Sequence, residues 1–186
     1  MESIILASGS PRRKELLNQL GIEFEVIPAD VDETLEEGLS PEEAVKQLSL
    51  KKAAAVAKMH PGKIVLGADT VVAYDGEILG KPEDENDALD MLLLLSGRTH
   101  HVYTGVALIY PDGKVKSFSE STEVVMYEND RQLIKEYIAT GEPMDKAGAY
   151  GIQGMGAILV EEIRGDYNNV VGLPVARITR ILKNLE

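Results

Sequence analysis

The chain contains no cysteine among its 186 residues. This absence excludes disulfide bonds and thiolate chemistry, and it suits a reducing cytoplasm. The beginning of the chain also lacks a basic segment followed by a long apolar stretch, so we expect no signal peptide. The longest aliphatic run covers residues 92–95, which is far too short to cross a bilayer. We therefore expect a cytoplasmic protein with no membrane partner.

Positive charge is scarce as well. The sequence has 19 Lys and Arg against 31 Asp and Glu, and its formal net charge is -12. A surface of this sign repels polyanions, so we expect no nucleic acid polymer as a partner. A small phosphorylated ligand is still compatible with it, if a locally cationic cleft and a divalent metal receive that ligand. The length suits one domain over residues 1–186, folded as two lobes.

Local patterns predict a mixed α/β protein. Two turns, Asp75-Gly76 and residues 111–113, indicate β-hairpins, and hairpins beside helices favour a mixed sheet over a purely parallel one. Apolar alternation and runs predict strands over residues 3–7, 22–26, 64–73, 77–81, 101–110, 114–126 and 157–163. Caps and helical periodicity predict helices over residues 11–20, 41–59, 84–95, 129–140 and 174–185.

Two arginines stand at the start of the first predicted helix. Ser10 is a good N-cap, and Pro11 suits the first helical position. Arg12 and Arg13 therefore fall in the first turn, where each cation costs about 0.3–1 kcal/mol against the helix dipole. A bound anion would compensate, because free N–H groups of the loop after Ser8 and both guanidinium groups would point at it. The alternative is that both side chains bend away to solvent or to carboxylates; we favour the anion site.

Two further charges occupy positions where apolar residues are expected. Lys52 lies near the centre of the apolar stripe of the helix that begins after Ser40, whereas Lys51 lies at the edge of that stripe. Asp69 interrupts an otherwise apolar strand. A buried charge is expensive unless it is paired or functional. For Lys52 we favour a functional role over an ammonium group that snorkels to water, and for Lys51 we favour snorkelling.

The hairpin around Asp75-Gly76 bears on the partner of Asp69. If Tyr74 pairs with Glu77, Lys81 falls one step from Asp69 along the ladder. A regular pleat places these two side chains on opposite faces, although Gly80 or a bulge could bring them together. A structural Asp–Lys pair and a functional pair both remain open.

Two loops complete the set of candidate segments. Glu33 lies in an acidic loop with Asp30 and Asp32 and is a candidate magnesium ligand, although such a loop is more often only solvated. The glycine-rich segment 144–154 would let the backbone approach a ligand closely, and the amide of Gln153 could contact the edge of a base. The alternative is an ordinary mobile loop. No spacing of histidines suggests a zinc site or a catalytic triad.

Taken together, these segments resemble the Maf family of nucleoside triphosphate pyrophosphatases. The resemblance follows the order of the chain and rests on residues 6–13 (LASGSPRR), 67–70 (GADT), 79–82 (LGKP), 96–99 (SGRT), 144–154 and 171–174 (VGLP). It implies a long mixed central sheet flanked by helices, with two lobes around a cleft, similar to the inosine triphosphate pyrophosphatases. It also implies a cytoplasmic homodimer that requires a divalent cation, Mg²⁺ or Mn²⁺.

The resemblance further implies an activity: hydrolysis of dTTP and UTP, and of related modified pyrimidine nucleotides, to the monophosphate and pyrophosphate. Arg12, Thr70 and Gln153 match the positions that set specificity in the dTTP/UTP subgroup, whereas the sibling subgroup acts on 7-methylguanosine triphosphate. On this hypothesis Asp69 is the base, and Lys52 and Lys81 neutralise phosphate charge. The other substrate-binding residues are Ser8, Ser10 and Arg13, and the metal ligands are Glu33 and Asp69. A nucleotide-binding regulator of septum formation, with little catalysis, is the alternative from another functional class.

Overall fold

A computed structural model of the chain describes residues 4–185. Its strands are β1 (Ile4–Leu6), β2 (Phe24–Val26), β3 (Ile64–Tyr74), β4 (Glu77–Leu79), β5 (Thr99–Ile109), β6 (Val115–Met126) and β7 (Val160–Arg164). Its helices are α1 (Pro11–Gln19), α2 (Pro41–Ala57), α3 (Glu85–Leu95), α4 (Arg131–Ile138), α5 (Tyr167–Val171) and α6 (Val175–Leu182). Three short 3-10 helices follow α4: η1 (Glu142–Asp145), η2 (Ala147–Ala149) and η3 (Met155–Leu159).

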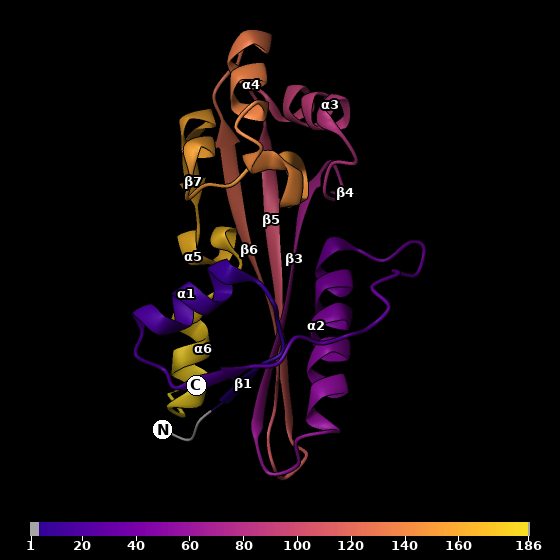
Figure 1. Cartoon of the computed structure of the whole chain (residues 1–186), viewed down its shortest axis with the longest axis vertical. Helices are drawn as coiled ribbons and strands as arrows, with labels where there is room; N and C mark the ends of the chain where they lie inside the picture. The colour runs from indigo at the N-terminus through magenta and orange to yellow at the C-terminus, as the bar shows by residue number, and fades with distance from the viewer. Residues whose placement is uncertain (1–3, 186) are drawn as a thin grey trace. The chain divides into compact units, whose positions relative to one another are not determined.

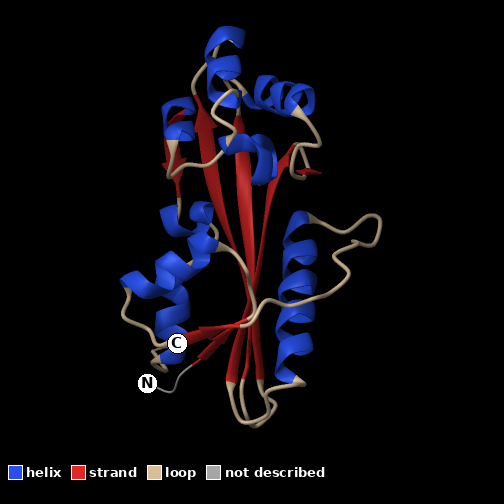
Figure 2. Cartoon of the chain, in the orientation of Figure 1, coloured by secondary structure: helices blue, strands red, loops and turns tan. Residues whose placement is uncertain are grey.

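The sheet is mixed, as the sequence predicts. Within the described residues it has seven strands in the order β2-β1-β3-β5-β6-β7, and β4 pairs with β3 (Figure 2). Strand β1 runs parallel to both β2 and β3, whereas the β3–β4 and β6–β7 pairs are antiparallel. Tyr74 pairs with Glu77 across the first hairpin, which confirms the predicted two-residue turn at Asp75-Gly76. The expectation of a mixed α/β fold is therefore confirmed.

The chain divides into two compact units, and strands β3, β5 and β6 contribute residues to both. Unit 1 comprises residues 1–69, 104–120 and 172–186. In Figure 1, helix α2 lies on one side of the strands of unit 1, and α1 and α6 lie on the other. Part of its core is a cluster of small and branched side chains from β1, the residue that follows β1, α2, β3 and β5, namely Ile5, Ala7, Ala53, Val56, Val65 and Ala107.

Unit 2 comprises residues 70–103 and 121–171. Its core joins the apolar faces of α3 and α4 to the strand residues of this unit. Ala88, Leu92 and Leu95 of α3 are almost fully buried, and so are Ile134 and Tyr137 of α4. The burial follows the helical spacing of these residues, which places them on one face of each helix.

Several predicted boundaries are corrected by the structure. Residues 157–159 belong to η3, so the predicted strand 157–163 begins at Val160. Strand β4 ends at Leu79 instead of Lys81, and α2 ends at Ala57, which leaves Met59 67% exposed instead of on the buried stripe. Ser3, the predicted first residue of the first strand, lies outside the described residues. Among residues 4–185, no helix is both long and apolar enough to span a membrane.

A buried histidine gives the core of unit 2 a predictable response to pH. His100 is fully buried, and its Nε2 atom lies 2.7 Å from the hydroxyl oxygen of Tyr150. Burial, together with repulsion from His101, lowers the pKa of His100 from 6.5 to about 4. Between these two values the unfolded chain binds a proton that the folded chain does not. Stability is therefore lost as the pH falls from about 6.5 towards 4.

We expect His100→Gln to flatten this response. Wild-type protein should lose on the order of 2 kcal/mol more unfolding free energy between pH 7.5 and pH 4.5 than the variant, since each pKa unit corresponds to about 1.4 kcal/mol. Urea unfolding at several pH values measures the difference. His101→Gln is the matched control, because the side chain of His101 is 40% exposed. It should keep most of the wild-type slope, since burial is the larger cause of the lowered pKa of His100 and is unchanged in this variant. Equal slopes for wild type and His100→Gln would contradict the prediction.

Candidate functional site

The candidate site of unit 1 depends on how closely α2 approaches two strands. A Cβ atom on Gly67 of β3 would lie 2.3 Å from the carbonyl oxygen of Ser49, and one on Gly105 of β5 would lie 2.1 Å from that of Val45. Only glycine fits at either position, because in both cases the obstructing atom belongs to the backbone of α2. The helix backbone therefore packs directly on the sheet.

This close packing brings the two predicted buried charges together. Lys52 is 9% exposed and Asp69 is 8% exposed, and the Lys52 ammonium nitrogen lies 2.7 Å from the Asp69 carboxylate. The same nitrogen lies 2.9 Å from the Glu33 carboxylate, whose side chain is 60% exposed. One ammonium group thus joins helix α2, strand β3 and the acidic loop. Lys51, by contrast, is exposed and donates a hydrogen bond to the carbonyl of Asp32.

The partner of Asp69 was missed at the level of sequence. The sequence predicts Lys52 and Asp69 as buried charges, but the register of the hairpin suggests Lys81 as the partner of Asp69. Lys81 belongs to unit 2, whereas Asp69 is the last residue of a unit 1 segment. The sequence does contain one indication of the Lys52–Asp69 pair: both residues are predicted buried charges of opposite sign, and such charges are usually paired.

The N-terminal loop and α1 form as predicted. The Ser10 hydroxyl accepts a hydrogen bond from the backbone N–H of Arg13, and Pro11 is the first helical residue. The Ser8 hydroxyl oxygen accepts from the N–H of Ser10 at 3.2 Å and from the Arg13 guanidinium at 3.1 Å. Arg13 is 9% exposed, and its Nε atom also donates to the carbonyl of Gly172 at 2.8 Å.

The Arg13 side chain therefore neither extends into solvent nor is held by carboxylates alone. Its guanidinium fastens the N-terminal loop to the segment before α6. Burial lowers the pKa of Arg13 and Arg12 acts in the same direction, while Asp69 and Glu33 raise it. A guanidinium group keeps its charge under such conditions. Arg13 thus contributes positive potential close to the carboxylates that Lys52 joins, while Arg12 is half-buried at the start of the same helix.

The remaining predicted residues lie in unit 2. Thr70 is half-buried on β3, and Lys81 and Gln153 are exposed. A hydrogen bond connects two of the predicted segments, residues 79–82 and 144–154. The backbone N–H of Gly148 donates to the carbonyl of Gly80, the residue before Lys81, at 3.0 Å. Packing also joins the glycine-rich segment to β3, since a Cβ atom on Gly148 would lie 2.9 Å from the Val72 side chain.

The donor set of unit 1 fits a magnesium-like cation in one specific way. Among residues 4–185, no cluster of three or more His, Cys, Asp or Glu side chains is arranged to hold a metal ion. Glu33 and Asp69, however, present carboxylate oxygens to the same ammonium group. Mg²⁺ commonly uses one or two carboxylates together with substrate phosphates and water. Glu33 and Asp69 fit a cation that arrives with a phosphorylated substrate.

Comparison with known proteins assigns the chain to a family. The family described as "Maf-like protein" matches residues 3–185. The chain belongs to the Maf family. A relative from Bacillus cytotoxicus is 56% identical over 100% of this chain and 97% of its own length, and another from Bacillus cereus strain ZK is 56% identical over 98% and 95%. Both relatives carry the name dTTP/UTP pyrophosphatase.

Solved structures agree on the fold of this Maf-family chain. The Ham1 protein of Staphylococcus aureus has a TM-score of 0.57 at 16% identity and covers 100% of both chains. A HAM1 protein from Coxiella burnetii also has a TM-score of 0.57, at 18% identity, and covers 99% of this chain and 100% of its own. At these identities the likeness concerns the fold alone. It confirms the predicted fold, a mixed central sheet flanked by helices.

Proposed function

We propose that this chain is a nucleoside triphosphate pyrophosphatase that hydrolyses dTTP and UTP to the monophosphate and pyrophosphate. The observation that carries the proposal is the buried Lys52 ammonium held between Asp69 and Glu33, in a Maf-family chain 56% identical to a protein named dTTP/UTP pyrophosphatase. Expensive buried charges of this kind are typical of catalytic sites.

In the proposed reaction, water attacks the α-phosphorus, and the bond between that phosphorus and the oxygen bridging to the β-phosphorus breaks. Asp69 accepts the proton of the attacking water. Lys52 and Lys81 neutralise the charge that develops on the transferring phosphoryl group and on the leaving pyrophosphate. Arg12 and Arg13, with the N–H groups of the loop from Ser8 to Ser10, hold the triphosphate near the start of α1.

Glu33 and Asp69 would hold a divalent cation, Mg²⁺ or Mn²⁺, which when bound supplies phosphate charge neutralisation and a lowered pKa for water. Thr70 and Gln153 would contact the pyrimidine, and Arg12 would assist them. These roles, the cleft between lobes, the homodimer and the cytoplasmic location remain predictions. Sedimentation equilibrium tests the dimer directly.

The activity is tested with purified protein and a panel of nucleoside triphosphates. We expect pyrophosphate, and no orthophosphate, from dTTP and UTP, with rates at least about tenfold above those for ATP and 7-methylguanosine triphosphate. EDTA should abolish turnover, and Mg²⁺ or Mn²⁺ should restore it. Nucleotide binding without turnover would instead support the regulatory alternative. Preference for 7-methylguanosine triphosphate would move the chain to the sibling subgroup, and the absence of both binding and turnover would overturn the proposal.

A further inference from the structure

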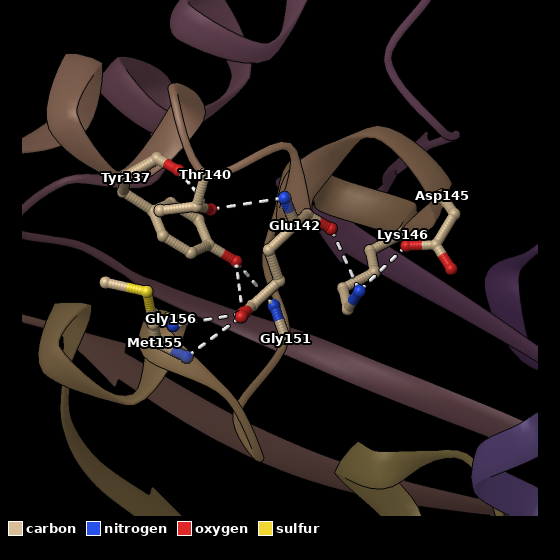
Figure 3. A network of polar contacts seen from close by, with 8 residues as sticks. All are labelled: Tyr137, Thr140, Glu142, Asp145, Lys146, Gly151, Met155 and Gly156. Atoms are coloured by element: carbon tan, nitrogen blue, oxygen red, sulfur yellow. Dashed lines mark hydrogen bonds and ion pairs between the residues drawn. The ribbon is translucent and has the colours of Figure 1, made fainter.

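In unit 2, the backbone that follows Gln153 closes on one carboxylate. The Glu142 side chain accepts hydrogen bonds from the backbone N–H groups of Met155 at 2.9 Å and Gly156 at 3.1 Å, and from the Tyr137 hydroxyl at 2.9 Å (Figure 3). The same Tyr137 hydroxyl accepts from the N–H of Gly151 at 3.1 Å. Gln153 lies between these fastened points and is itself exposed.

Glu142 is in turn held by its neighbours. Its N–H donates to the Thr140 hydroxyl at 3.2 Å, and that hydroxyl donates to the carbonyl of Tyr137 at 2.7 Å. The Lys146 ammonium donates to the Glu142 carbonyl at 2.9 Å and to the Asp145 carboxylate at 2.7 Å, as Figure 3 shows. Tyr137 belongs to α4 and is 2% exposed. The Glu142 carboxylate is therefore bound by a residue, Tyr137, that is packed in the core of unit 2.

Three glycines allow the backbone to approach these side chains closely. A Cβ atom on Gly154 would lie 2.2 Å from a Glu142 carboxylate oxygen, and one on Gly156 would lie 2.7 Å from the Tyr137 hydroxyl and 2.4 Å from the Gly151 carbonyl oxygen. A Cβ atom on Gly151 would lie 2.6 Å from the Lys146 side chain. The glycines thus let the backbone pack closely against Glu142, Tyr137 and Lys146 of the same chain. This differs from the role expected from the sequence, the close approach of backbone to ligand.

The carboxylate is ionised in this setting. Burial acts to raise the pKa of Glu142, but the N–H groups of Gly156 and Met155, the Tyr137 hydroxyl and Lys146 together hold the pKa below its usual value. An ionised carboxylate accepts several hydrogen bonds at once, whereas an amide in its place offers one acceptor oxygen and two donors. Only a carboxylate satisfies the donors of Tyr137, Met155 and Gly156 together.

We propose that Glu142, supported by Tyr137, is a positioning residue that fixes the backbone of residues 151–156 and thereby the direction of the Gln153 side chain. The inference rests on the proposed function, in which Gln153 contacts the pyrimidine. In this role Glu142 needs no contact with the substrate. It acts by holding the two backbone groups that follow Gln153, while Tyr137 holds the one that precedes it. A preorganised loop avoids the cost of ordering Gln153 at the moment of binding.

The test uses Glu142→Gln, with Glu136→Gln as the matched control. Glu136 lies on α4 and accepts a hydrogen bond from the Gln132 side chain at 2.9 Å. Hydrogen exchange of the full-length protein without nucleotide should be faster at the amides of Gly151, Met155 and Gly156 in Glu142→Gln. With substrate, we expect KM for UTP and dTTP to rise about tenfold with kcat nearly unchanged, and selectivity against CTP to fall. The control should match wild type in each measurement.

A double variant separates positioning from general damage. If Glu142 acts through Gln153, adding Glu142→Gln to Gln153→Ala causes less than about a twofold further rise in KM, because the shared contact is already lost. Tyr137→Phe, which removes two of the hydrogen bonds, should reproduce the faster exchange at Gly151 if Glu142→Gln does not fold.

Unchanged exchange, or a full tenfold rise added to Gln153→Ala, would overturn the inference while leaving the proposed function intact. A wild-type protein that hydrolyses no nucleotide, with exchange accelerated as expected in Glu142→Gln, would overturn the proposed function and the link to Gln153 together.

Discussion

Asp69→Asn is expected to lower pyrophosphate release from UTP by about 10²–10⁴-fold, the usual contribution of a general base, while leaving the protein folded. The amide keeps the volume of the carboxylate but cannot take a proton from water. Lys52 does not become an isolated buried cation in this variant, because Glu33 lies 2.9 Å from its ammonium nitrogen. Nucleotide binding should be retained, since the change removes a negative charge close to a triphosphate and Glu33, the other proposed cation ligand, keeps its carboxylate.

Three measurements check this expectation: single-turnover rates, calorimetric titration with UTP and Mg²⁺, and thermal melting. Asp112→Asn is the control, because Asp112 lies in the β5–β6 turn and accepts a hydrogen bond from the nearby N–H of Lys114. Turnover within fivefold of wild type in Asp69→Asn would remove Asp69 from the role of base. Lys52→Met is a poorer probe, because it would leave two carboxylates without their shared cation, and breaking a buried pair from one side costs about 3–5 kcal/mol.

Gly105→Ala is expected to destabilise the fold by roughly 3 kcal/mol or more. The new methyl group would lie 2.1 Å from the carbonyl oxygen of Val45 and 2.3 Å from its carbonyl carbon. No side-chain rotation relieves a clash with backbone, so α2 must shift away from β5. Because α2 also carries Lys52, the variant should lose turnover at temperatures where it is still folded.

Urea unfolding of wild type and variant measures this loss. Gly80→Ala is the matched control, since no atom lies within 4 Å of the Cβ position at Gly80 and its φ is not in the left-handed region. The control should change the unfolding free energy by less than about 0.5 kcal/mol. A Gly105→Ala protein with wild-type stability would show that α2 does not need its close contact with the sheet.

Several elements were predictable because their determinants are local. Ser40, Pro41 and Glu43 form the predicted capping box of α2, and the Asp75-Gly76 turn sets the register of β3 against β4. The spacing of apolar residues along α2 correctly indicated that Lys52 is buried and Lys51 is not. The start of β7 was predicted wrongly, since residues 157–159 are apolar but form the end of η3. There the N–H of Tyr127 donates to the carbonyl of Leu159, a contact between segments far apart in sequence.

The unusual residues can be recognised without the fold: a cation at a helix N-terminus, a lysine on an apolar stripe, an aspartate in an apolar strand, and a run of glycines. Their contacts, in contrast, follow from the packing of segments that are distant in sequence. Arg13 reaches Gly172, Lys52 reaches Asp69, and Glu142 reaches Gly156. The physical reason is that caps and periodicity depend on neighbours along the chain, whereas a buried charge is satisfied by whichever partner the packing of distant segments brings within hydrogen-bonding distance.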